Sequence, residues 1–110
     1  MVAEDVRRVN EKERRDKIGK LLMPAGEPVG DPGRRRGIRL MPGGLDAARE
    51  FLRHFEQIGQ VEHVEGYDGV RINLGGEDRV GLREHSKSGE PTIDVQVQWL
   101  PERVRKIKFV

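Results

Sequence analysis

Polar and apolar residues alternate through the C-terminal part of the chain, and the polar ones are of types that bind anions. Apolar side chains occupy every second position in runs such as residues 70–74 and 93–99. In a β-strand this period of two places the intervening side chains together on the opposite face. The polar face predicted in this way carries Arg71, Asn73, Arg79, Arg83, His85, Thr92, Asp94, Gln96, Lys106 and Lys108. Six of them are basic or can become so, and one is a carboxylate. Such a face suits a phosphodiester backbone, although every antiparallel sheet exposes polar residues on its wet side and cations also protect edge strands.

A second group of candidate residues forms the loop that follows His85. The sequence Ser86-Lys87-Ser88-Gly89 offers two hydroxyls, an ammonium group and a permissive glycine, and Pro91 follows. Hydroxyls and backbone N–H groups in a turn can form an anion-binding concavity. The spacing matches neither a Walker A loop nor a dinucleotide-binding glycine motif, which excludes nucleotide hydrolysis by a P-loop mechanism.

The remaining residue types exclude several kinds of site. The chain has no cysteine, which excludes disulfides, thiolate zinc sites and cysteine nucleophiles. Its three histidines form neither an H-x-x-x-H nor an H-E-x-x-H pair, so a zinc-hydrolase motif is missing. We therefore predict no metal site and no cofactor.

One helix and a sheet are expected to position these residues. Apolar side chains recur at steps of three and four from Leu45 to Ile58, which is typical of an amphipathic helix, and Gly59 is expected to end it in a left-handed conformation. The alternating segments after Val61 are joined by short turns, which favours antiparallel pairing. The sequence therefore predicts an α+β domain in which the helix packs on one face of a four- to five-stranded, mostly antiparallel sheet.

The N-terminal third has a different composition. Residues 1–22 are rich in charge and predict a helical leader, either a solvated helix or a basic arm that contacts RNA. Residues 23–37 contain repeated Pro and Gly, which is typical of a linker, and end in Arg34-Arg35-Arg36, a run that could bind phosphate or remain solvated. We expect a leader and linker over residues 1–37 and the compact domain over residues 38–110.

Net charge alone does not identify a partner. The 110 residues hold 21 Lys and Arg against 19 Asp and Glu. Residues 1–37 carry ten basic and seven acidic side chains, whereas residues 38–110 carry eleven and twelve. A uniformly basic domain is thus excluded, and any polyanion site must come from the local arrangement of charge. No apolar run is long enough for a membrane span and no signal-peptide pattern follows Met1, so we expect no membrane insertion by this chain.

Two strand segments carry a resemblance to a known family. The stretch from Gly81 to Val95, with its R-x-x-S-x-S-G-x-P-T-I-D pattern, and the closing segment Arg105-Lys106-Ile107-Lys108-Phe109 resemble C-terminal toxin domains of bacterial polymorphic toxins, contact-dependent or secreted. Such domains are similar to the barnase, EndoU, colicin and RelE-type ribonuclease group. The resemblance covers residues 38–110 and implies a helix followed by an antiparallel sheet whose open face cuts RNA. It also implies delivery to the cytoplasm of a target cell, or secretion as part of a larger toxin, and a cognate immunity protein.

The resemblance and the polar face together predict a metal-independent endoribonuclease that acts as an interbacterial toxin. RNA would be cleaved by attack of its own 2′-OH, which needs a base, an acid and cations around the phosphate. The predicted catalytic residues are Arg83, His85, Asp94, Lys106 and Lys108, with His85 as base or acid and Asp94 as base or orienting group. The predicted substrate-binding residues are Ser86, Ser88, Thr92 and Arg71. The alternative is a non-catalytic RNA-binding or regulatory module that uses the same face.

Overall fold

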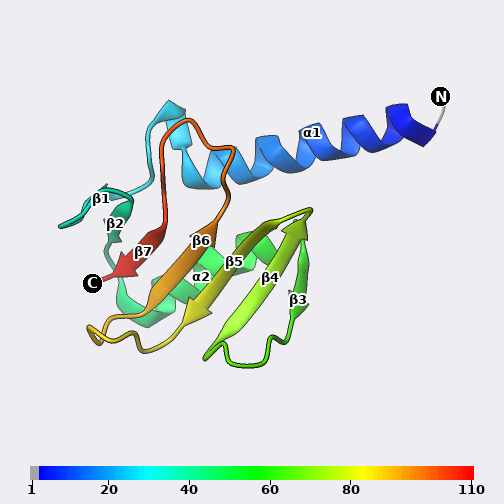
Figure 1. The fold of residues 1–110 in the computed structure, drawn as a ribbon. Helices are drawn as coiled ribbons and strands as arrows, with labels where there is room; N and C mark the ends of the chain where they lie inside the picture. Colours follow the sequence, from blue (N-terminus) through cyan, green and yellow to red (C-terminus); the bar gives the residue numbers. More distant parts are fainter. Residues whose placement is uncertain (1–2) are drawn as a thin grey trace.

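The computed structural model describes residues 3–110 and shows two helices, a short 3-10 turn and one sheet (Figure 1). The helical elements are α1 (Ala3–Leu22), η1 (Pro24–Gly26) and α2 (Gly44–Glu56). The strands are β1 (Asp31–Pro32), β2 (Ile38–Met41), β3 (Gln60–Glu62), β4 (Val70–Gly75), β5 (Asp78–Arg83), β6 (Thr92–Gln96) and β7 (Lys106–Phe109). The predicted α+β class is confirmed.

The sheet is larger than predicted. Its seven strands have the order β1-β2-β7-β6-β5-β4-β3, and every neighbouring pair is antiparallel except β2 and β7, which are parallel. The mostly antiparallel arrangement is confirmed, whereas the predicted count of four to five strands is too low. The strands added at the two edges are only two to four residues long, so their sequences show too little alternation to be recognised. The parallel pairing of β2 with β7 joins distant parts of the chain, so no local sequence pattern predicts it.

Helix α2 covers the apolar face of the sheet. Ala48, Leu52 and Phe55 are buried on one side of the helix, as the 3- and 4-residue spacing predicts. They meet the apolar positions of the strands, including Ile72, Val80 and others in the same core cluster. The expected left-handed stop at Gly59 is wrong, since its φ is not positive. Gly59 is instead required because a Cβ there would collide with the carbonyl oxygen of Asn73 on β4.

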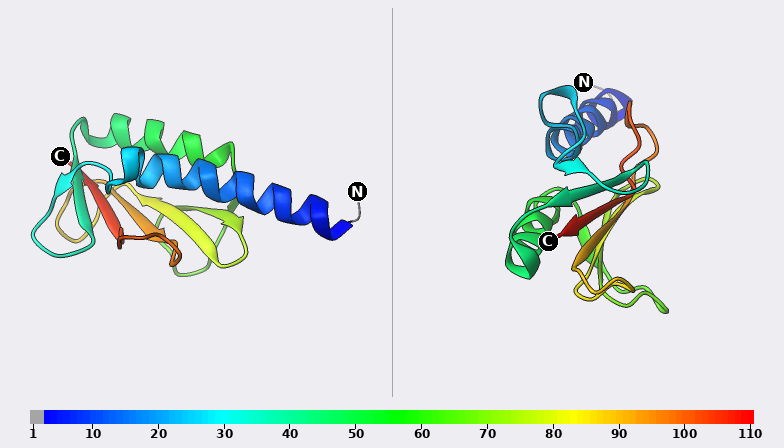
Figure 2. Two further views of the ribbon diagram at one scale, coloured as in Figure 1. Left: turned by 90° about the horizontal axis from the view of Figure 1, so that it is seen from above. Right: turned by 90° about the vertical axis from the view of Figure 1, so that its left-hand side faces the viewer.

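Helix α1 runs along one end of the sheet (Figures 1 and 2). Its residues Ile18 and Leu22 are fully buried, and Met23 and Val29 after the helix belong to the same core cluster. Residues that the sequence assigned to a leader and linker therefore help to build the core. The boundary predicted at residue 38 does not coincide with an edge of the packing.

Candidate functional site

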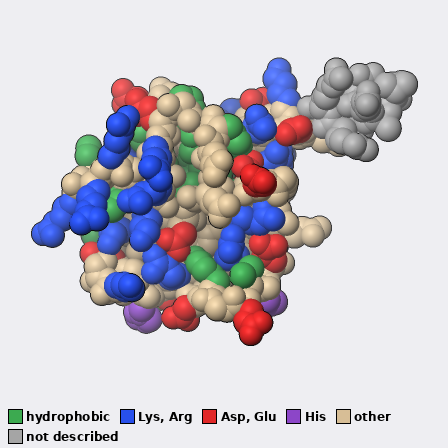
Figure 3. Space-filling model, viewed as in Figure 1, with side chains coloured by type: hydrophobic (Ala, Val, Ile, Leu, Met, Phe, Trp, Pro, Cys, Tyr) green, Lys and Arg blue, Asp and Glu red, His purple; other side chains and the backbone are tan. Residues whose placement is uncertain are grey.

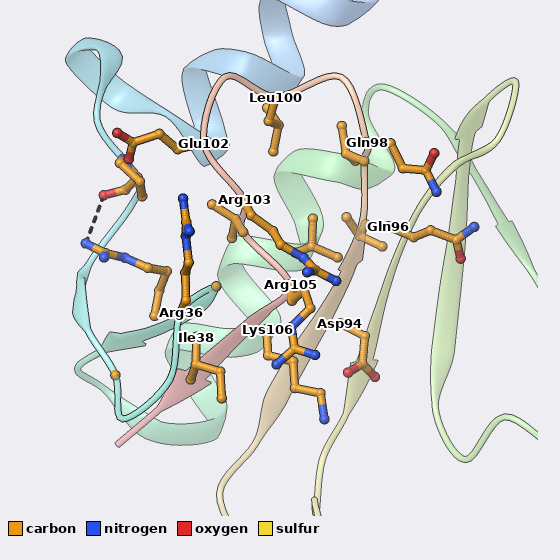
Figure 4. A pocket seen from close by; sticks show the side chains of 18 of the residues that line it. Arg36, Ile38, Asp94, Gln96, Gln98, Leu100, Glu102, Arg103, Arg105 and Lys106 are labelled. Atoms are coloured by element: carbon orange, nitrogen blue, oxygen red, sulfur yellow. Dashed lines mark hydrogen bonds between the residues drawn. The ribbon is translucent and has the colours of Figure 1, made fainter.

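A groove of about 1250 Å³ lies over the polar face of the sheet, on the side opposite helix α2. Strands β4 to β7 form its floor. One wall is the turn between β1 and β2, and the other is the connection between β6 and β7 (Figure 4). Lys and Arg side chains gather on this side of the molecule (Figure 3).

The lining of the groove is strongly cationic. Two carboxylates, Asp94 and Glu102, line it together with nine basic side chains, namely Arg34, Arg35, Arg36, Arg39, Arg71, Arg79, Arg103, Arg105 and Lys106. Two of the nine have partners: Arg39 donates to the carbonyl oxygens of residues 28–30, and Arg79 pairs with Glu62 at 3.0 Å. Within the described residues, the other seven make no ion pair and no side-chain hydrogen bond. The Nε atom of Arg105 is buried without a partner.

One carboxylate of the floor is neutralised by its neighbours. Asp94 Oδ2 accepts a hydrogen bond from Arg83 Nε at 2.7 Å and another from the Tyr67 hydroxyl at 2.8 Å. Its Oδ1 accepts from Arg83 Nη2 at 3.0 Å, which completes a bidentate ion pair. Hydrogen bonding to Asp94 raises the pKa of Arg83. Because Asp94 is paired with Arg83, Glu102 is the only other carboxylate among the described residues that line the groove.

The ring of Tyr67 is held between the backbone of Gly81 and the side chain of Arg71. The ring lies over Gly81 on β5, where an added Cβ would come within 2.5 Å of the phenol oxygen. The guanidinium carbon of Arg71 lies 5.4 Å from the centroid of the Tyr67 ring, which is a cation–π contact. Burial raises the pKa of Tyr67 far above its ordinary value, and the hydrogen bond to Asp94 adds to this effect. Tyr67 is therefore a neutral donor that holds Asp94 in place.

The structure brings four of the predicted site residues together. Asp94 on β6 lies opposite Lys106 on β7 and Gly81 on β5, and Gly81 lies opposite Arg71 on β4. Arg71, Asp94 and Lys106 line the groove, and Arg83 joins them through its ion pair with Asp94.

Three further predicted residues form a separate cluster beside the β5–β6 loop. Lys108 Nζ donates to Ser88 Oγ at 2.6 Å, and Ser88 Oγ lies 3.1 Å from Ser86 Oγ. The carboxylate of Glu90 lies 4.0 Å from Lys108 Nζ. The Ser88 hydroxyl lowers the pKa of Glu90, and the charge of Lys108 contributes. A carboxylate of the chain itself thus lies beside the ammonium group and hydroxyls predicted to contact phosphate.

The last two predicted residues do not line the groove. Thr92 is fully buried, and its hydroxyl donates to the carbonyl oxygen of Glu90 at 3.1 Å. The alternation placed it on the polar face, but its neighbours cover it. His85 is exposed in the loop after β5, beyond the end of the strand.

The sequence interpretation missed Tyr67 and both walls of the groove. A signal for Tyr67 existed, because Gly81 interrupts a row of polar-face arginines on β5, and a glycine inside a strand often marks a close approach by another group. The run Arg34–Arg36 was visible but had no assigned place. Arg103 lies in a stretch without periodicity, and the alternation of the closing segment assigned Arg105 to the same face as Ile107 and Phe109.

The comparisons with known proteins assign no family. No family model matches the sequence, and no curated protein or solved structure is significantly similar to it. The resemblance to toxin domains therefore stays a prediction. None of the helices in residues 3–110 combines the length and the apolar character needed to cross a bilayer.

Proposed function

We propose that the chain binds RNA in the groove over the open face of its sheet. The observation that carries this proposal is the unequal distribution of charge. The whole chain is nearly balanced, with 21 basic and 19 acidic side chains, whereas nine basic and two acidic side chains line the groove. Unpaired cations facing one concave surface attract a polyanion, since neutralised phosphates release their condensed counterions.

The types of side chain favour a nucleic acid over other polyanions. Eight of the nine cations are arginines, whose planar guanidinium groups match phosphate oxygens in a bidentate geometry. Gln96 and Gln98 line the same groove, on the far side of Arg103 and Arg105 from Arg36 (Figure 4). Amide side chains donate to and accept from the edges of unstacked bases, which single-stranded RNA exposes. The groove thus offers contacts for both parts of a nucleotide.

Binding has more support from these contacts than cleavage has. In the described part of the chain, no histidine lines the groove. Asp94 accepts three hydrogen bonds, which leaves it poorly placed to accept a proton from a 2′-OH, and burial keeps Tyr67 protonated. The endoribonuclease activity and the toxin role stay predictions that the same experiments test.

The direct test is fluorescence anisotropy with a labelled, unstructured RNA 12-mer in EDTA-containing buffer. Contact with four or more phosphates should make the logarithm of affinity fall with the logarithm of salt at a slope of about −3 or steeper. DNA of the same sequence is the parallel ligand and should bind more weakly. Absence of binding at 50 mM salt would refute the proposal, and equal affinity for the DNA would refute RNA as the preferred ligand.

A matched pair of variants locates the binding site. Arg103→Gln removes one unpaired charge from the groove, whereas Arg53→Gln removes the same charge from helix α2, where Arg53 pairs with Glu50 at 2.6 Å. Arg103→Gln should weaken binding several-fold and reduce the salt slope by about 0.7, the value of one phosphate contact on a single strand. Arg53→Gln should retain the wild-type slope. Equal losses from the two variants would place the binding elsewhere.

The predicted ribonuclease is tested on the same samples and in cells. A discrete fragment pattern from total RNA in EDTA would establish cleavage. Induced wild-type protein should then stop bacterial growth, and Arg83→Ala and Asp94→Ala should relieve the arrest while retaining the circular dichroism spectrum of the folded protein. RNA that is bound but intact after prolonged incubation would favour the non-catalytic module.

A further inference from the structure

A buried carboxylate joins helix α1 to the sheet and to the loop that walls the groove. Asp78, at the start of β5, is 7% exposed and is the one buried charged residue among those the structure describes. Its Oδ2 accepts a hydrogen bond from Arg14 Nη1 of α1 at 2.7 Å and another from Trp99 Nε1 at 2.8 Å. We call these three residues the Asp78 junction.

The loop that carries Trp99 has few other polar attachments. Residues 97–105 connect β6 to β7, and Leu100 to Arg105 line the groove. In the described chain, residues 98–103 make no backbone–backbone hydrogen bond. The bond from Trp99 to Asp78 is also the one side-chain hydrogen bond that these six residues make. Val97 and Val104 are buried at the two ends of the loop. Its middle is therefore attached through the packing of Trp99 and Leu100 on the core and through the hydrogen bond of Trp99 to Asp78.

Two arginines of helix α1 contact the surroundings of the bond between Trp99 and Asp78. Arg14 packs against the backbone of Gly75, where an added Cβ would lie 3.0 Å from its Nε atom. The guanidinium carbon of Arg15 lies 5.2 Å from the centroid of the Trp99 ring. Arg14 shares a helix face with Ile18 and Leu22 because the three are spaced by four, and burial of these two apolar residues fixes that face toward the core. The helix thus presents Arg14 to Asp78 from a fixed position.

We propose that helix α1 holds the groove wall in its RNA-binding position through the Asp78 junction, so that Arg14 and Asp78 are positioning residues for the RNA site. Without Arg14, the buried charge of Asp78 loses its counterion, and the carboxylate gains by turning toward water. The Trp99 attachment then weakens and the loop with Arg103 becomes mobile. Only the last step, the effect on RNA, rests on the proposed function.

Trp99 is the single tryptophan of the chain, so it reports on the junction directly. Arg14→Gln should shift Trp99 emission to longer wavelength and increase its quenching by acrylamide. It should also lower RNA affinity several-fold, by no more than Arg103→Gln does, because the loosened loop presents Arg103 less well to the RNA. The matched control is Lys17→Gln, which removes the same charge from an exposed position of the same helix. Arg14→Lys, which keeps the charge near Asp78, should recover part of both signals.

The outcomes separate the two proposals. Wild-type emission and quenching in Arg14→Gln would overturn the inference that α1 holds the loop. Increased quenching with an RNA affinity equal to that of Lys17→Gln would overturn the positioning role. If wild-type protein binds no RNA, the proposed function fails, and quenching still decides whether α1 holds the loop.

A second variant guards against loss of folding in Arg14→Gln. Trp99→Phe keeps an aromatic ring in place and removes the N–H donor. Amide hydrogen exchange of residues 98–103 should then accelerate relative to wild type, while exchange in β5 and β6 stays slow. Unchanged exchange in residues 98–103 would overturn the inference.

Discussion

Gly81 is the position where a single methyl group tests the geometry of the groove floor. In Gly81→Ala the new Cβ would lie 2.5 Å from the Tyr67 oxygen, 2.8 Å from its Cζ atom and 3.0 Å from Arg71 Cγ. Real Cβ atoms do not approach other groups this closely, so the Tyr67 ring must leave its place. Its hydrogen bond to Asp94, 2.8 Å long, is then lost.

The magnitude follows from the contacts that Tyr67 gives up. A hydrogen bond to a charged acceptor contributes about 1.5–3 kcal/mol, and the cation–π contact with Arg71 about 0.5–1 kcal/mol. Alanine offsets part of this, since it restricts the unfolded chain more than glycine does, by about 0.4–1 kcal/mol. We expect Gly81→Ala to reduce the free energy of unfolding by about 2 kcal/mol.

A double-mutant cycle isolates the cause. In a Tyr67→Ala background nothing of the ring remains for the Cβ to meet, and Arg71 is free to turn aside. There Gly81→Ala should stabilise the protein by about 0.4–1 kcal/mol, so that the sign of its effect reverses. Urea unfolding followed by Trp99 fluorescence measures all four proteins, with equal m values as the control for two-state behaviour. Equal destabilisation by Gly81→Ala in both backgrounds would refute the packing of Tyr67 on Gly81.

Two further predictions concern the core and the Ser88 cluster. Ile18→Ala should lower the free energy of unfolding in urea by about 2–4 kcal/mol because Ile18 is fully buried. The control Lys17→Ala changes an exposed neighbour and should lower it by under about 0.5 kcal/mol. Equal stability of the two variants would show that α1 does not unfold together with the rest of the domain. Since the folded-state pKa of Glu90 is lowered, its contribution to stability is present at neutral pH and is lost as the pH falls below about 4.3. Glu90→Gln should therefore flatten the fall of the melting temperature in acid, and parallel acid profiles for the variant and wild type would contradict this.

The residues on the floor of the groove were predictable because the alternation that places them is a local sequence pattern. A strand repeats every two residues, so the sequence alone places Arg71, Asp94 and Lys106 on one face once strands are assumed. Thr92 shows the limit of this inference, since alternation gives the face of a residue but not its exposure. Exposure depends on neighbours that arrive from other strands and loops.

The walls of the groove were not predictable for the opposite reason. Arg34–Arg36 reach the groove because β2 pairs in parallel with β7, some 68 positions further along the chain in the pairing of Ile38 with Lys106. Arg103 reaches it on a loop attached through Trp99 to Asp78, the first residue of β5. Both contacts are long-range, and neither segment has a periodic pattern of its own. Tyr67 lies in a turn and was equally without a pattern, although the glycine beneath it was visible.

Most cations of the groove stay unpaired because only two carboxylates line it, and one of these, Asp94, is held by Arg83 and Tyr67. On the outer side of helix α2, Arg49 binds Glu84 and Arg53 binds Glu50, and these four side chains are about half exposed or more. Exposed pairs of this kind contribute little to stability, about 0–1 kcal/mol each. The attraction of the groove for RNA, by contrast, is a sum over unpaired charges and weakens steeply with salt. With a slope of about −3, raising salt from 50 to 200 mM should lower RNA affinity about 60-fold, while the free energy of unfolding in urea changes by under about 1 kcal/mol. Anisotropy and urea titrations at matched salt measure both effects, and a stability that fell in step with affinity would mean that the ion pairs hold the fold together.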